Sequence, residues 1–399
     1  MDQIDTYDAV VIGGGPAGAT AAHELAKAGR SVLLLDREGR IKPCGGAIPP
    51  RLIRDFDIPD ALLVARIRCA RMVAPSDAKV DIPIEGGFVG MVDRGPFDEW
   101  LRERAASAGA VRARGSFEAI ERGADGRAVV RYLARDRHGE GGETVRVKAR
   151  LVIGADGARS EVARQEVPRS DEGRFVFAYH EIVRSPKGEP GHDGTRCDVV
   201  YNGEFSPDFY GWVFPHGDTM SIGTGSADKG FSLRTGTAAL RQAAGLDGLE
   251  TIRREGAPIP MKPLPRWDDG RNVVLAGDAA GVVAPASGEG IYYAMAGGRY
   301  AADAVAAFLA SSDARCLKQA RRGFMKAHGR VFWLLGIMQW FWYSTDKRRE
   351  RFVKMCEDPD VQRLTWQAYM HKKLVRADPM AHMRIFFKDV AHLLGFARV

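Results

Sequence analysis

YDAVVIGGGPAG, residues 7–18, runs from a short apolar strand directly into the motif G-x-G-x-x-G. A helical pattern follows to about Ala28, Gly29 ends it, and a second apolar strand leads to Asp36. Strand, glycine turn, helix, strand and acidic residue in this order are typical of a dinucleotide-binding unit on a parallel sheet. We therefore predict an α/β fold that begins with a Rossmann-type domain.

Each residue of this unit has an expected physical role. Gly13 allows the tight turn, Gly15 lets the backbone approach a pyrophosphate, and Gly18 lets helix and strand pack closely. The helix N-terminus offers unpaired N–H groups and the positive end of its dipole to phosphate oxygens. Asp36 is placed to accept hydrogen bonds from a ribose diol, and we count its neighbour Arg37 in the same cofactor-binding set.

Two later apolar strands also end in an aspartate. Residues 151–153 run into Asp156, and residues 272–276 run into Asp278. Ligands of open α/β sheets bind at the carboxyl ends of such strands. The segment 285–291 then leads into a helix of small residues, which supplies a second helix N-terminus. Each aspartate alone is explained as well by helix capping, but both together behind the glycine motif favour one bound dinucleotide.

This combination resembles the FAD-dependent oxidoreductases of the hydroxybenzoate-hydroxylase fold. The resemblance implies that the glycine motif and its acid hold the ADP half of FAD. It also implies that Asp278 takes the ribityl or pyrophosphate region, and that Gly290 and Ile291 approach the flavin ring. Asp156 lies in a stretch that serves both FAD and the incoming nicotinamide, and Arg94 corresponds to an arginine against the phosphates. A second G-x-G-x-x-G is absent from the sequence.

Three further stretches narrow the resemblance to the geranylgeranyl reductases, especially their chlorophyll and bacteriochlorophyll branch. They are the loop 42–50, the segment 210–215 with the later G-T-G at 223–225, and the aromatic-rich C-terminal region. The resemblance implies reduction of three double bonds of a geranylgeranyl group to give phytyl, with NADPH as the reductant. The substrate is then geranylgeranyl (bacterio)chlorophyll or geranylgeranyl diphosphate. It also places three residues of the first loop against the flavin: Cys44, Gly45 and Gly46.

Alternating aromatic residues suit such an apolar substrate. Tyr210, Trp212 and Phe214 share one face if the segment is a strand. Core packing explains such a row equally well without the resemblance; with it, we expect a substrate-binding wall. An isolated prenyl double bond needs a proton as well as a hydride, and the candidate proton donors are Cys44 and Tyr210.

The composition indicates an intracellular protein of two or three domains. The chain has 399 residues, with 45% hydrophobic and 27% charged residues, close to globular averages. Its 5 cysteines form no C-x-x-C pair, which argues against a disulfide framework and a metal site. The first residues lack the pattern of a signal peptide, so we expect a cytoplasmic location. The apolar run 331–343 is too short to span a bilayer, and is expected to be buried, to insert at a membrane surface or to line a channel.

Positive charge is concentrated at the C-terminal end. Residues 315–399 hold 18 Lys and Arg against 7 Asp and Glu, a net charge of +11, whereas the preceding residues carry −4. Residues 383–397 show one apolar stripe at helical spacing. We predict peripheral attachment to an anionic surface of the photosynthetic membrane, although a solvated or core-packed helix gives the same pattern. No nucleic-acid-binding motif is present, so nucleic acid is not an expected partner.

The expected architecture is a discontinuous FAD domain, a β-rich substrate domain and a helical C-terminal region. The boundaries are FAD domain 1–64, 93–165 and 265–311; substrate domain 65–92 and 166–264; helical region 312–399. One alternative is a flavin monooxygenase or halogenase on the same fold, against which Gly281 counts, since many hydroxylases have a histidine there. A second alternative is a non-catalytic prenyl-lipid carrier.

Overall fold

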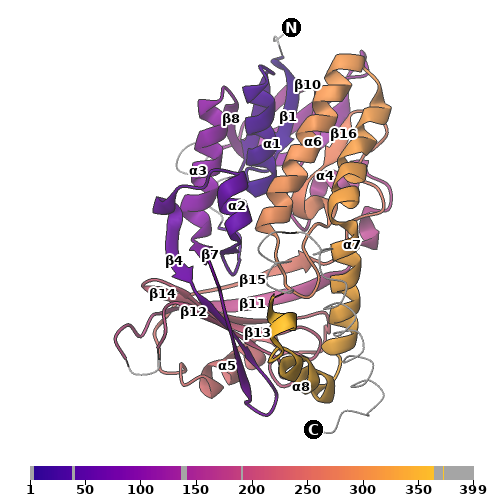
Figure 1. The fold of residues 1–399 in the computed structure, drawn as a ribbon. Helices are drawn as coiled ribbons and strands as arrows, with labels where there is room; N and C mark the ends of the chain where they lie inside the picture. The colour runs from indigo at the N-terminus through magenta and orange to yellow at the C-terminus, as the bar shows by residue number, and fades with distance from the viewer. Residues whose placement is uncertain (1–3, 38–40, 136–141, 190–191, 364–371, 373–399) are drawn as a thin grey trace. The chain divides into compact units, whose positions relative to one another are not determined.

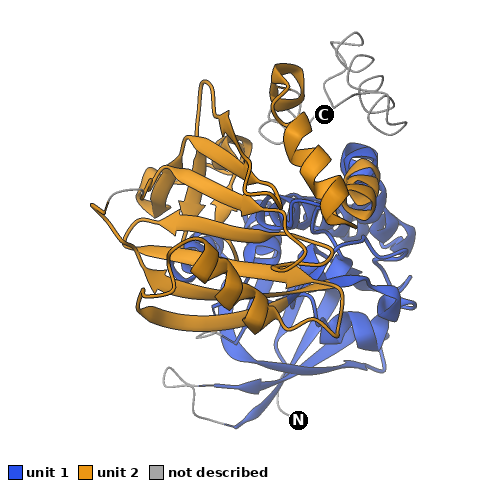
Figure 2. Cartoon of the chain, turned by 90° about the horizontal axis from the view of Figure 1, so that it is seen from below, with its two compact units in different colours: residues 1–42, 94–175, 258–332 blue, residues 43–93, 176–257, 333–399 orange. Residues whose placement is uncertain are grey.

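A computed structural model describes residues 4–37, 41–135, 142–189, 192–363 and 372. The chain forms two compact units, each assembled from separate segments (Figures 1 and 2). Unit 1 comprises residues 1–42, 94–175 and 258–332, and unit 2 comprises residues 43–93, 176–257 and 333–399. Each unit therefore consists of segments that are distant from one another in the sequence.

Unit 1 is built on a six-stranded sheet. Its parallel part has the order β8-β2-β1-β10-β16, and β9 pairs antiparallel with the far ends of β8 and β10. The central strands are buried and rich in Val, Ile and Leu, as expected of a parallel sheet covered on both faces. The strands are β1 Thr6–Ile12, β2 Val32–Asp36, β8 Val111–Arg122, β9 Ala128–Ala134, β10 Thr144–Gly154 and β16 Val273–Leu275.

Helices α1 and α6 pack together at a place where only small residues fit. A Cβ on Gly298 of α6 would stand 2.3 Å from the backbone oxygen of Ala17 on α1. This close approach brings the N-terminal ends of the two helices near each other. The helices of unit 1 are α1 Pro16–Lys27, α3 Arg94–Ser107, α4 Glu161–Glu166, α6 Ile291–Ser311 and most of α7, which spans Lys318–Trp342.

Unit 2 is built on a seven-stranded sheet with the order β15-β11-β14-β13-β12-β5-β6. A second, three-stranded sheet has the order β3-β7-β4. The strands are β3 Ala47–Ile48, β4 Leu63–Ile67, β5 Cys69–Val73, β6 Lys79–Pro83, β7 Val89–Val92, β11 Phe175–Arg184, β12 Arg196–Val200, β13 Gly211–His216, β14 Thr219–Ser226 and β15 Thr251–Pro260. The helices are α2 Pro50–Asp55, α5 Leu233–Ala243 and α8 Asp346–Met355.

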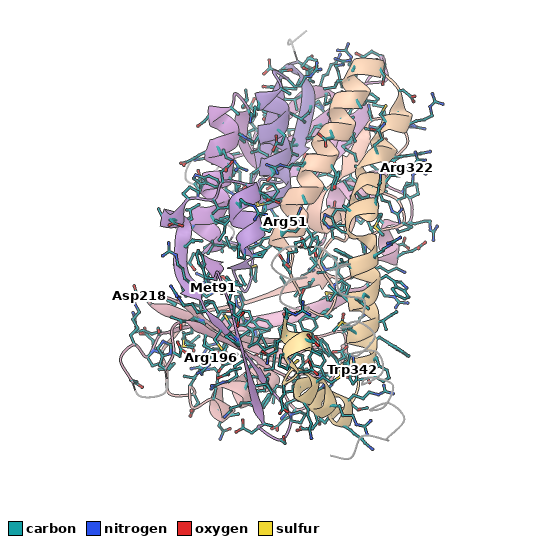
Figure 3. All side chains as sticks on the ribbon, in the orientation of Figure 1. Arg51, Met91, Arg196, Asp218, Arg322 and Trp342 are labelled. Carbon is teal, nitrogen blue, oxygen red and sulfur yellow. The ribbon has the colours of Figure 1, made fainter. Side chains whose placement is uncertain are left out.

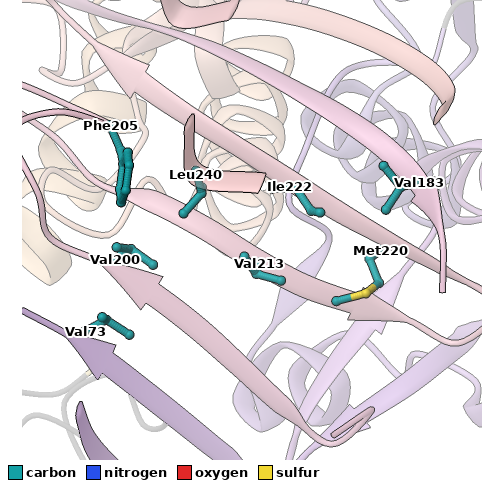
Figure 4. Packing of buried hydrophobic residues seen from close by; sticks show 8 residues of the cluster. All are labelled: Val73, Val183, Val200, Phe205, Val213, Met220, Ile222 and Leu240. Atoms are coloured by element: carbon teal, nitrogen blue, oxygen red, sulfur yellow. The ribbon is translucent and has the colours of Figure 1, made fainter. Parts of the chain in front are cut away.

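The two faces of the large sheet carry different side chains. On one face, Val213 of β13 packs with Ile222 and with Leu240 of α5 in a buried apolar cluster (Figure 4). Phe214, the next residue of β13, packs instead against a second cluster that includes Met91 and Cys197. Successive side chains of a strand point to opposite faces. The face opposite α5 therefore carries Phe214 and its alternate neighbours.

The apolar run at the end of α7 is only partly buried. Phe332 and Trp342 are buried, whereas Trp333 and Trp340 are 70% and 75% exposed. The side chains of α7 between Arg322 and Trp342 are drawn in Figure 3. Leu334 and Ile337 are also exposed, at 40% and 41%. Burial therefore accounts for one side of this helix only. The predicted stripe 383–397 lies outside the described residues.

Candidate functional site

The glycine turn of unit 1 is shaped by close backbone packing. Gly13 has φ +105°, and a Cβ there would stand 2.3 Å from the carbonyl oxygen of Ala155, at the end of β10. A Cβ on Gly18 would stand 1.9 Å from the carbonyl oxygen of Gly13. Both positions exclude any side chain because backbone fills the space.

Gly15 is different, because apart from its two neighbours in the chain no residue has an atom within 4 Å of the position its Cβ would take. It is the N-cap of α1, followed by Pro16, and no side chain caps the helix. The first N–H groups of α1 thus face a space that the protein leaves open. This combination fits a phosphate group, which an uncapped helix N-terminus binds through those N–H groups and its dipole.

Asp36, at the end of β2, is tied to the same turn. Its Oδ2 accepts a hydrogen bond from the N–H of Gly14 at 2.6 Å, and its Oδ1 lies 3.7 Å from Nη1 of Arg102 on α3. Arg102 also donates to the carbonyl of Gly14 at 3.3 Å and pairs with Glu99. We did not predict Arg102, although it lies two helical turns after Arg94, near the same face of α3. Arg37 follows β2 directly and is exposed.

Asp156 uses its carboxylate to cap α4. Its Oδ2 accepts from the N–H groups of Glu161 and Val162 at 2.7 and 3.2 Å, and its Oδ1 accepts from the hydroxyl of Ser160. Burial raises the pKa of Asp156, and these hydrogen bonds oppose the rise. The side chain of Asp156 therefore acts as a helix cap, the alternative given above. The part of this stretch that remains for contact with a ligand is the backbone beside Gly13.

Asp278 lies in the short helical turn after β16. It forms an ion pair with Lys42, and a Cβ on Gly290 would come within 3.9 Å of its Oδ1. Gly290 is the N-cap of α6, which lacks a side-chain cap, and Ile291 begins the helix and is buried. Asp278, Gly290 and Ile291 are therefore neighbours at the second helix N-terminus. We did not predict the role of Lys42, because nothing in its sequence context points to Asp278.

Arg94 and Gly281, both in unit 1, were also singled out from the sequence. Arg94 begins α3, is buried, and donates from Nε and Nη2 to Asp98 at 2.9 and 2.7 Å. Gly281 has φ +80°, and a Cβ there would stand 2.3 Å from the carbonyl oxygen of Lys262. A histidine at Gly281 is therefore incompatible with this turn, which accounts for the difference from the hydroxylase pattern.

In unit 2, three aromatic rings form a row along β13. The ring centroids of Tyr210 and Trp212 are 6.1 Å apart, and those of Trp212 and Phe214 are 6.4 Å apart. Tyr210 stacks on Phe209 at 4.1 Å, just before the strand. The loop with Cys44 lies against the end of the row, because a Cβ on Gly45 would stand 3.3 Å from the ring of Phe214.

A network of hydrogen bonds fixes the indole ring of Trp212. Its indole N–H donates to Ser221 Oγ at 3.0 Å, and Ser221 Oγ lies 2.8 Å from Nδ1 of the buried His180. Nε2 of His180 lies 3.1 Å from Glu255. Burial favours a higher pKa for Glu255, but the hydrogen bond with His180 and the charge of Arg253 hold that pKa below its ordinary value. We did not predict this network, since its residues are far apart in the sequence.

Three protein-family models match the chain. An NAD(P)-binding Rossmann-like domain matches residues 11–51, an FAD binding domain matches residues 63–182, and a lycopene cyclase protein model matches residues 232–391.

Known proteins are similar over almost the whole chain. The geranylgeranyl diphosphate reductase of Rhodobacter capsulatus is 60% identical over 98% of both chains. The chloroplastic geranylgeranyl diphosphate reductase of Oryza sativa is 36% identical over 96% of this chain and 85% of its own. A solved geranylgeranyl bacteriochlorophyll reductase-like protein from Thermoplasma acidophilum has a TM-score of 0.81, at 22% identity, over 95% of this chain and 100% of its own. The last similarity concerns the fold.

Proposed function

The chain belongs to the geranylgeranyl diphosphate reductase family. We propose that it saturates three double bonds of a geranylgeranyl group and so produces a phytyl chain. It is an FAD-dependent oxidoreductase of mixed α/β architecture. NADPH is the proposed reductant. The acceptor is proposed as a geranylgeranyl group carried on a (bacterio)chlorophyll or on a diphosphate.

Unit 1 supplies the groups that fit FAD. We assign the pyrophosphate to the open space at Gly15 and the N-terminus of α1, and the ribose of the ADP half to Asp36. Asp278 with its partner Lys42 and the N-terminus of α6 at Gly290 are assigned to the rest of the cofactor. Reduced FAD, when bound, supplies the hydride for the reaction.

The observation that carries the substrate proposal is the ring row on β13. A prenyl chain is apolar and extended, and the rings of Tyr210, Trp212 and Phe214 form a continuous apolar row, in which Phe214 is half-buried and the other two rings are buried. The hydrogen bond from Trp212 to Ser221 satisfies the indole N–H away from that surface. The wall can therefore exclude water without leaving a polar group unpaired.

The isolated double bond also requires a proton. No carbonyl polarises it, so the less substituted carbon must be protonated as the hydride reaches the tertiary carbon. Cys44 is half-buried beside Phe214, and Tyr210 lies at the other end of the row. We propose both as candidate proton donors. Replacing each in turn by a residue without an acidic hydrogen shows which of the two donates the proton. Cys44→Ala and Tyr210→Phe make this comparison.

The test is an oxygen-free turnover with defined prenyl compounds. The protein is reduced with NADPH under nitrogen, and geranylgeranyl diphosphate or a geranylgeranyl pigment is added. Mass spectrometry should show the prenyl chain gaining two hydrogens at each of three double bonds as the flavin is reoxidised. A monooxygenase or halogenase would require oxygen, and a carrier would bind the prenyl compound without reoxidising the flavin. Either result would exclude the proposal.

We further propose that the basic region 315–399 attaches the protein to an anionic membrane surface. Among the described residues, no helix is long and apolar enough to cross a membrane. Trp333, Ile337 and Trp340 are exposed and recur at helical spacing on α7, so they share one face. Tryptophan favours the interface between lipid and water. The exposed Lys347 and Lys354 of α8 follow in the chain, and each Lys or Arg near an anionic surface contributes about 1 kcal/mol.

Flotation with liposomes tests this attachment. The parent should float with anionic liposomes at low salt and much less at high salt, because salt screens the attraction. Trp333→Ser combined with Trp340→Ser should weaken flotation. Ile252→Ser is the matched control, since Ile252 of β15 is 47% exposed outside this face. Flotation that ignores lipid charge, or that is lost equally in the control, would contradict the proposal.

A further inference from the structure

His216 is the last residue of β13 and lies beside the cysteine loop of unit 2. Its side chain is 6% exposed. Nδ1 lies 3.1 Å from Oδ1 of Asp93, the residue after β7, and Nε2 lies 3.1 Å from the carbonyl oxygen of Gly45. The ring thus bridges the end of β13, the end of β7 and the loop.

Both partners of the ring only accept hydrogen bonds. A carboxylate and a backbone carbonyl have no hydrogen to give, and a neutral imidazole has a single N–H to donate. The two contacts of His216 are therefore both hydrogen bonds only when both nitrogens carry protons. We propose that His216 is a positioning residue which, as an imidazolium, pins the Cys44–Gly46 loop to β13 and Asp93.

The loop is shaped to receive this ring. Gly46 has φ +71°, and a Cβ there would stand 2.5 Å both from Cε1 of His216 and from the carbonyl oxygen of Val92. The N–H of Val92 donates to the carbonyl of Gly46 at 2.9 Å. Only glycine allows the ring and the end of β7 to approach the loop this closely. The glycines are therefore needed for the contact with His216 as well as for the turn.

The position of the thiol depends on the same contacts. The N–H of Gly46 lies 3.4 Å from Sγ of Cys44, and Gly45 lies against the ring of Phe214. If the bond between His216 and Gly45 is lost, the loop keeps its pairing with Val92 but loses its bridge to β13. The inference deepens the proposed function, because it concerns the loop and the ring row assigned there to the reaction.

Other charged groups around this bridge are paired with partners outside it. β7 itself carries no titratable side chain. The charged groups that neighbour the bridge on β4, in the turn after β13 and next to Asp93 in the chain have partners of their own: Arg66 with Asp60, Asp218 with Lys187, and Arg94 with Asp98. Asp93 is thus the carboxylate that faces His216.

Alkylation of Cys44 by iodoacetamide in the full-length, FAD-loaded protein tests the proposal. Peptide mass spectrometry reads Cys44 against Cys69 of β5, which is also half-buried and serves as the internal reference. His216→Ala should raise the ratio of Cys44 to Cys69 alkylation by roughly fivefold, the change expected when a hydrogen bond of ordinary strength is lost.

Two further variants keep the test decisive. His216→Lys should keep the alkylation ratio near that of the parent, because an ammonium group also offers several donors. Asp93→Asn removes the charge that faces Nδ1 of His216, so it should raise the ratio in the same direction, and it provides the test if His216→Ala does not fold. An alkylation ratio that is the same in His216→Ala and in the parent would overturn the proposal, as would an Asp93→Asn ratio identical to the parent's. The readout needs no prenyl substrate, so it succeeds or fails separately from the proposed reaction.

Discussion

Gly15→Ala should separate cofactor binding from folding. Gly15 has φ −75° and ψ −175°, which alanine adopts without strain. Apart from the two chain neighbours, no residue has an atom within 4 Å of the new Cβ. Alanine is a poorer N-cap than glycine, but it also restricts the unfolded chain. These two effects offset each other, so the free energy of unfolding of the apoprotein should change by less than about 1 kcal/mol.

Binding of FAD should respond much more strongly. The new methyl group occupies the space assigned to the pyrophosphate, and displacing the phosphate from one N–H group loses a charge-assisted hydrogen bond of about 1.5–3 kcal/mol. This corresponds to an increase of roughly 10- to 150-fold in the dissociation constant. Gly18→Ala is the contrasting variant, because its Cβ would stand 1.9 Å from the carbonyl oxygen of Gly13. Overpacking of this kind costs about 1–3 kcal/mol or more, so this variant should destabilise the apoprotein itself.

The assay has two parts. Urea denaturation of the apoproteins gives the free energies of unfolding, and titration with FAD, followed by quenching of flavin fluorescence, gives the dissociation constants. Gly15→Ala should be as stable as the parent and bind FAD weakly. If it binds FAD as tightly as the parent, the open space at Gly15 does not hold the pyrophosphate. If it is destabilised as much as Gly18→Ala, the argument from packing is wrong.

Four other variants, at three positions, test separate parts of the account. Asp278→Ala should lower FAD occupancy after purification, and an absorption spectrum with full flavin content would contradict its assignment. Trp212→Ala should slow reoxidation of the flavin by a geranylgeranyl compound more than its reduction by NADPH; equal effects in stopped-flow traces would make the ring row ordinary core. Asp156→Ala should cost about 1–2 kcal/mol by uncapping α4. Burial raises the pKa of Asp156, so the native state holds its proton more tightly; the parent should therefore lose stability relative to Asp156→Asn as pH rises from about 4 through the folded pKa. Parallel urea titrations of the two proteins across pH would expose the opposite trend.

Local sequence patterns predicted the elements of the cofactor domain well. The apolar strands before Gly13, Asp156 and Asp278 are β1, β10 and β16, three parallel neighbours in one sheet. The spacing of apolar residues and glycines suffices here, because a buried parallel strand reads as a continuous apolar run. What the motif could not separate was ligand contact from packing. Gly13 and Gly18 are constrained by backbone atoms of the protein, and Gly15 faces open space.

Contacts between distant segments were not predictable in the same way. Arg102 reaches the glycine turn from α3, and Lys42 reaches Asp278 across more than two hundred residues. The role of Asp156 as a helix cap was an alternative that the local pattern left open, and the geometry of its hydrogen bonds describes it. His216 was not predicted, because its two partners, Asp93 and Gly45, become neighbours only through pairing of β strands.

The most direct test of the central claim is reoxidation of the NADPH-reduced, FAD-loaded protein by geranylgeranyl compounds under nitrogen. The flavin absorbance is followed together with the mass of the prenyl chain, with geranylgeranyl diphosphate and a geranylgeranyl pigment assayed separately. The account predicts that the flavin absorbance returns in step with the gain of two hydrogens per double bond, ending at the phytyl chain. A flavin that stays reduced with both compounds, and reoxidises only when oxygen is admitted, would contradict it.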